Sequence, residues 1–98
     1  MNTYYVYMLA HMDGEAREVN VEFEPGKSYT IADTLDAIFM NGQNDFQPVD
    51  GMCSVSVGDI IELCPLHDYY RVDAVGFTRL TYREFNRAVI ARAIAKAG

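Results

Sequence analysis

The stretch that most constrains the fold runs from Gly51 to Leu80, where apolar runs alternate with turn-forming residues. Over residues 53–57, apolar side chains alternate with serines, which is the two-residue period of a strand with one buried face. A second apolar run covers 60–64, and β-forming residues return over 69–75. Because the Pro and Asp within 65–68 favour a turn, the last two runs are predicted to form a β-hairpin.

The same stretch resembles a known family. The runs SVSVGDIIEL (54–63) and YYRVDAVGF (69–77), together with the upstream IFMNGQNDFQP (38–48), are similar to the YodL-like domain found in small proteins of bacteria, phages and conjugative elements. The similarity covers roughly residues 31–80. It implies an association with mobile genetic elements, and it supplies no catalytic residues.

The chain before this stretch predicts a first hairpin. Residues 4–9 are apolar or aromatic on both sides, which indicates a central or two-sided strand. Asp13 and Gly14 form a tight-turn pair. Residues 17–24 then alternate, with glutamates pointing to solvent and an apolar set pointing to the core. The residues expected to face the core are Val19, Val21 and Phe23.

A helix is predicted to begin after Thr30 and to end at Asn41. Thr30 is a suitable N-cap, and Asp33 three positions later completes a capping-box pattern. Gly42 is predicted to supply the left-handed residue that follows the helix. The apolar residues expected on the buried side are Ile31, Leu35, Ile38 and Phe39.

A second helix is predicted over residues 82–96, begun by a capping box of Thr81 and Glu84. Ile90 and Ile94 point away from the expected core side and form a second apolar facet. This facet is expected either to pack on a neighbouring loop or to form a homodimer interface. The residues expected to face the core are Tyr82, Phe85 and Val89, with Ala88 beside them.

The predicted element order is β-β-α-β-β-β-α, which belongs to the α+β class. We expect a small two-layer domain with a mostly antiparallel sheet and both helices on one face. The 98 residues suit a single domain, and half of them are hydrophobic. The N-terminus lacks signal-peptide features, and no apolar run approaches the ~20 residues that a membrane helix needs. A cytoplasmic location without a membrane partner is therefore expected.

Charge is divided unevenly along the chain. Residues 1–80 carry four Lys and Arg against thirteen Asp and Glu, whereas residues 81–98 carry four basic residues against one acid. An acidic body disfavours contact with a phosphate backbone and favours a host protein with a basic surface. The outward side of strand 17–24 and the turn-rich segment 43–52 are the predicted contacts. Their partner-binding candidates are Glu18, Glu22, Glu24, Asp45, Phe46 and Asp50.

This layout predicts a non-enzymatic interaction protein of the kind that mobile elements carry. Its most specific version is an inhibitor of a host nucleic-acid-handling defence enzyme, because the basic groove of such an enzyme would attract carboxylates. The alternative is a nucleic-acid-binding domain that uses the basic C-terminal helix. The residues that would serve this alternative are Arg83, Arg87, Arg92 and Lys96.

No catalytic site, metal site or cofactor is predicted. Cys64 and His67 have the spacing of one zinc-ligand pair, but structural zinc sites use four ligands in two close pairs. A catalytic thiolate needs an adjacent base or a positive environment. Cys53 and Cys64 lie instead among apolar β residues of an acidic protein, so both are interpreted as structural thiols.

Overall fold

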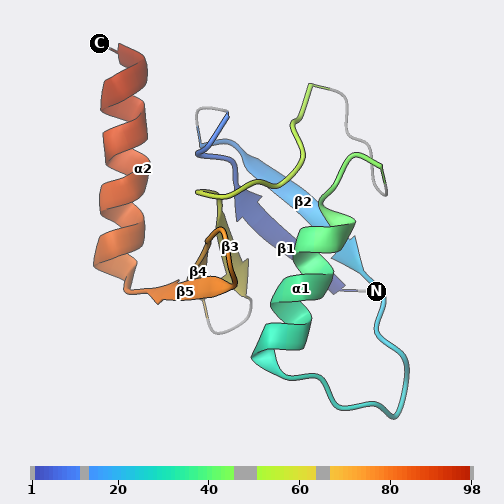
Figure 1. Ribbon diagram of the computed structural model, residues 1–98. Helices are drawn as coiled ribbons and strands as arrows, with labels where there is room; N and C mark the ends of the chain where they lie inside the picture. The colour runs from blue at the N-terminus through green and yellow to red at the C-terminus, as the bar shows by residue number, and fades with distance from the viewer. Residues whose placement is uncertain (1, 12–13, 46–50, 64–66, 98) are drawn as a thin grey trace.

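The computed structural model describes residues 2–11, 14–45, 51–63 and 67–97. These form a five-stranded antiparallel sheet and two helices in the order β-β-α-β-β-β-α, which confirms the predicted α+β class (Figure 1). The elements are β1 (Asn2–Tyr7), β2 (Ala16–Val21), α1 (Ile31–Asn41), β3 (Ile60–Leu63), β4 (Asp68–Val72), β5 (Phe77–Leu80) and α2 (Tyr82–Ala97).

The strands lie side by side in the order β2-β1-β3-β4-β5. β1 pairs with β2 along its whole length and with β3 through Tyr5, Val6 and Tyr7. The prediction of a central, two-sided first strand is therefore confirmed. β2 and β5 are the two edge strands of the sheet.

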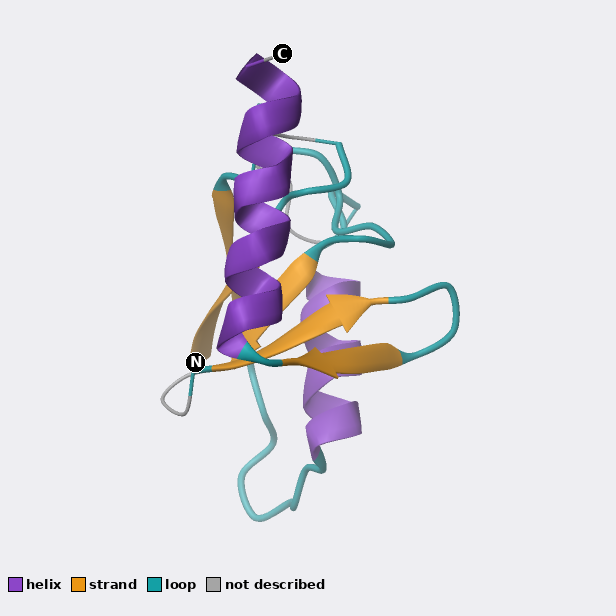
Figure 2. Cartoon of the chain, turned by 90° about the vertical axis from the view of Figure 1, so that its left-hand side faces the viewer, coloured by secondary structure: helices purple, strands orange, loops and turns teal. Residues whose placement is uncertain are grey.

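The two helices pack on opposite faces of the sheet, so the expectation that both share one face is wrong. In β1, Val6 joins the core beneath α1, whereas Tyr7 joins the core beneath α2. In β3, Ile61 joins the core beneath α1, and Ile60 joins the core beneath α2. Because neighbouring residues of a strand point to opposite faces, the sheet lies between the helices (Figure 2). The physical reason is that the central strands are apolar on both sides, so each face needs a cover.

The segment 53–57 is irregular rather than the predicted strand, and the third strand after α1 is β5 instead. Side-chain amides hold the segment in place. Gln43 Nε2 donates to the Val55 carbonyl at 2.9 Å, and Asn44 Nδ2 donates to the Met52 carbonyl at 2.9 Å. Val55 is buried without being in a strand, because its carbonyl accepts from the Gln43 side chain and its N–H donates to the Gly42 carbonyl at 3.1 Å.

Both predicted capping boxes are present, but the helix end at Gly42 differs from the prediction. Thr30 and Asp33 exchange hydrogen bonds of 3.1 Å at the start of α1. Gly42 has φ −80°, so it is not left-handed. A Cβ at this position would overlap the side chain of Val55. The glycine is required by the close approach of segment 53–57, which no local pattern reveals.

Substitution Gly42→Ala should destabilise the fold by about 1–3 kcal/mol, because the added methyl overpacks against Val55. The backbone angle itself accommodates alanine. Urea unfolding of Gly42→Ala, Val55→Ala and the double variant measures the coupling. The cost of Gly42→Ala should shrink when Val55 is already alanine, and an equal cost in both backgrounds would refute the contact as its cause.

A buried carboxylate ties the end of β1 to the start of β3. Asp59 is 1% exposed, and its two oxygens accept hydrogen bonds from the backbone N–H of Ala10 at 2.8 Å and of Ser56 at 2.9 Å. Burial raises the pKa of the Asp59 carboxyl, and the backbone hydrogen bonds oppose that rise in part.

The raised pKa of Asp59 gives the stability a definite pH dependence. Above the unfolded pKa of about 4, the folded state retains a proton at this site that the unfolded state has lost. The unfolding free energy of the native chain should therefore fall relative to that of Asp59→Asn as the pH rises from about 4 through the folded pKa. Denaturant unfolding of both proteins across this range measures the difference. A difference that grows with pH would contradict the assignment.

Candidate protein-interaction face

The half of one sheet face formed by β1 and β2 is left uncovered by α2. The helix contacts β4 and β5, and its core partners at the end of β1 are Tyr7 and Leu9. Beyond them, Tyr5 is 36% exposed and pairs across the strands with Glu18. We call this region the open sheet face. Its residues are Thr3, Tyr5, Glu18, Asn20 and Glu22.

The open sheet face carries two carboxylates without partners. The side chains of Glu18 and Glu22 are exposed and make no hydrogen bond or ion pair with any of the residues that the structure describes. Glu24 differs, because it forms an exposed ion pair of 2.8 Å with Lys27. Such surface pairs contribute little stability, but they do reduce the local negative charge. Of the three predicted glutamates, Glu18 and Glu22 are therefore exposed without a charge partner among the described residues, and Glu24 is neutralised by Lys27.

The other predicted partner-binding residues do not join this face. Asp45 is exposed, and it follows Asn44, whose side chain bonds Arg17 on the α1 side of the sheet. Phe46 and Asp50 lie outside the described residues. The structure therefore separates Asp45 from the glutamates of β2.

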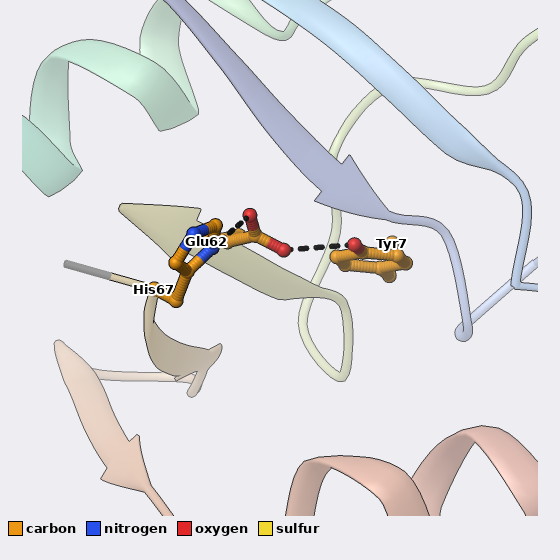
Figure 3. A network of polar contacts seen from close by, with 3 residues as sticks. All are labelled: Tyr7, Glu62 and His67. Atoms are coloured by element: carbon orange, nitrogen blue, oxygen red, sulfur yellow. Dashed lines mark hydrogen bonds and ion pairs between the residues drawn. The ribbon is translucent and has the colours of Figure 1, made fainter. Parts of the chain in front are cut away.

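Beside Tyr5, a polar network crosses the strands toward β4. Glu62 is opposite Tyr5 in β3 and is only 7% exposed. Its carboxylate accepts a hydrogen bond from Tyr7 Oη at 2.8 Å and lies 3.1 Å from Nδ1 of His67. Figure 3 shows Tyr7 and His67 approaching this carboxylate from different sides. No local sequence pattern predicts this network, because it depends on pairing between strands far apart in the chain.

The network places an exposed imidazole beside a buried carboxylate. His67 has a left-handed φ of 54°, and its side chain is mostly exposed. The imidazole meets the Glu62 carboxylate through Nδ1, at 3.1 Å from Oε2. Within the described residues, no three His, Cys, Asp or Glu side chains are grouped to hold a metal. Cys64, the other half of the zinc-like spacing, lies outside those residues.

Two cationic side chains of the sheet form ion pairs with neighbouring carboxylates. Arg71 lies 2.8 Å from Asp73, and Arg79 lies 3.0 Å from Asp68. An open depression of about 370 Å³ beside the start of α2 includes His67 and Arg79 in its lining, and Asp68 lies there too. The depression is therefore no cationic pocket for an anion.

The C-terminal helix differs from the prediction at one core position and agrees at the others. Phe85, Ala88 and Val89 pack on the sheet as predicted. Tyr82 was expected in the core but is 66% exposed, although its ring still lies 6.1 Å from that of Tyr69. Its position at the first turn of the helix places it at the rim of the packed region.

The described helices include none that is long and apolar enough to cross a lipid bilayer. Comparisons with protein-family models, with curated proteins and with solved structures found no match. Fold and site together define the class of protein: a small α+β domain with helices on both faces of an antiparallel sheet and an open, carboxylate-bearing face.

Replacing Tyr7 by Phe should cost about 1–3 kcal/mol of unfolding free energy, because the buried Glu62 carboxylate loses a hydrogen-bond donor. The ring contact between Tyr7 and Phe85 is retained in this variant. Tyr5→Phe is the matched control on the same strand, and it should change stability by no more than about 0.5 kcal/mol. Denaturant unfolding of both variants measures the contrast, and equal costs would contradict a structural role for the network.

Proposed function

We propose that this protein is a non-enzymatic interaction module that acts in the cytoplasm and binds a partner surface rich in Lys and Arg through its open sheet face. The observation that carries the proposal is the pair of exposed carboxylates of Glu18 and Glu22, which have no partner in the described part of the chain and lie beside the exposed ring of Tyr5. An aromatic side chain supplies contact area at an interface, and the carboxylates steer and select a cationic partner.

In its most specific form, the partner is a host nucleic-acid-handling defence enzyme that the protein inhibits by occupying its basic groove. The net negative charge of residues 1–80 and the resemblance to YodL-like domains of mobile elements support this version. A surface that carries carboxylates can occupy a groove built for phosphates, because both present negative oxygens to Lys and Arg.

The alternative is nucleic-acid binding by α2, and one observation favours it. Arg83 and Arg87 are exposed and have no ion-pair partner among the described residues. Glu84 lies between them in the sequence, and the neighbouring body is acidic. The acidic side chains of the body would repel the phosphates of a nucleic acid bound to α2, and we therefore favour the protein partner.

The double substitution Glu18→Gln/Glu22→Gln tests the proposal with little change of shape. Loss of the two charges should slow association with the basic partner about tenfold at low salt and much less at high salt. Affinity capture from host extract identifies the partner, and surface binding kinetics at both salt levels give the rates.

The matched control is Asp36→Asn/Asp45→Asn, which removes two exposed charges elsewhere on the molecule. This control should leave the association rate within about twofold of the native value at low salt, because its charges lie outside the contact. The proposal is wrong if both double variants retain the same partners with the same rates.

A further inference from the structure

Helix α2 is apolar on two opposite sides. Phe85 and Val89 pack on the chain's own sheet, whereas Ile90 and Ile94 are 50% and 66% exposed. Phe85 and Ile94 are nine residues apart, about two and a half turns, so they point in opposite directions. Apolar residues on opposite sides are typical of a helix buried between two layers. Among the described residues, only one of these layers is present, the sheet on the side of Phe85 and Val89.

The shape of the molecule leaves the outer side of α2 open. Both views show the C-terminal turns of the helix rising beyond the rest of the domain (Figures 1 and 2). The molecule measures 49 × 30 × 24 Å, which is elongated for a single small domain. The outer side of the helix is therefore accessible to another molecule along most of its length.

The outer side of α2 is basic as well as apolar. Arg83 and Arg87 precede Ile90 and Ile94 at spacings of three and four residues, so the four side chains share one side of the helix. We call these four residues the outer facet. It carries two cations and two exposed isoleucines, and the open sheet face carries Glu18, Glu22 and the exposed ring of Tyr5. The two surfaces match in charge and in apolar character.

We propose that the partner of the open sheet face is a second copy of this chain, whose α2 lies across that face with its outer facet inward. The inference rests on the proposed function and names a second copy, in place of a host enzyme, as the basic partner of that face. In a two-fold symmetric pair, each sheet has its own α2 over β4 and β5 and the partner's α2 over β1 and β2. Each helix is then buried between two sheets, and the contact is made twice.

Direct packing of α2 against α2 fits the charges less well. That arrangement would gather the arginines of both outer facets in one interface, and Glu84 is the only acidic residue of the helix. Like charges across an interface cost affinity. Packing of the helix on the open sheet face instead opposes each pair of arginines with Glu18 and Glu22, and it places the isoleucines near Tyr5.

A charge-swap experiment tests the arrangement. The native protein should have a mass near 22 kDa by light scattering, twice the 11.1 kDa of one chain. Glu18→Lys/Glu22→Lys and Arg83→Glu/Arg87→Glu should each be monomeric alone, because each opposes like charges in both contacts. Mixed together they should form a 22 kDa heterodimer, because both contacts then pair opposite charges. A monomeric native protein, or a mixture that stays monomeric, would overturn the proposal.

The variant Ile90→Ala/Ile94→Ala keeps every charge and alters only exposed positions, so it tests the helix without a risk to the core. It should weaken dimerisation at least tenfold, and a dimer of unchanged affinity would refute the role of the outer facet. A native monomer whose Arg83→Glu/Arg87→Glu variant loses binding to a single-stranded RNA probe would assign the facet to nucleic acid instead.

Failure of the dimer and failure of the proposed function give different results. If the native protein is monomeric but Glu18→Gln/Glu22→Gln still loses a captured basic protein, the open sheet face has a foreign partner and only the dimer is wrong. If the native protein is monomeric and that variant captures the same proteins as the native chain, both proposals fail.

Discussion

The structure depends on a constraint set by its central strands, which carry apolar side chains on both sides. β1 and β3 each place one buried residue beneath α1 and its neighbour beneath α2. Burying apolar surface contributes about 25 cal/mol per Å² to the stability of the fold, so both faces of the sheet must be shielded from water. The irregular segment around Val55 assists α1 in this role. On the other face, Leu9 packs beside α2, and within the described residues the β1–β2 half of that face stays open. The candidate site therefore arises from incomplete cover of the sheet.

The segment that assists α1 is anchored by an arginine inside the core. Arg17 is 1% exposed, and its guanidinium donates to Asn44 Oδ1 at 2.8 Å and to the Cys53 carbonyl at 2.7 Å. Burial lowers the pKa of Arg17, but an arginine remains protonated because its reference pKa is so high. A buried charge is tolerated only where hydrogen bonds replace its hydration. These bonds fix the segment 51–57 over the start of β2, which lets Val55 close that face of the sheet.

Patterns that depend on near neighbours could be predicted from the sequence, and patterns that depend on distant partners could not. The Thr30–Asp33 and Thr81–Glu84 capping boxes join residues three apart, and both are present. Alternation also places Glu18 outward correctly. The irregular path of 53–57 depends on amides of the preceding turn, and the Tyr7–Glu62–His67 network depends on strand register. Arg17 lies on the same side of β2 as Val19, but hydropathy disfavours a buried arginine unless a distant partner such as Asn44 is known.

The open sheet face and the outer facet match in charge, but no ion pair joins them among the described residues. Lys27, Arg71 and Arg79 of the body each lie beside an acid, so they cannot neutralise Glu18 and Glu22. Arg83 lies on the side of α2 opposite Phe85, which packs against the sheet, whereas Arg87 lies at the border of that side and lines a depression with Ile60 and Arg71. Screening limits charge interactions to about 8–10 Å at physiological salt, so attraction requires the two surfaces to come close. In the proposed dimer, the second molecule brings its outer facet onto the open sheet face.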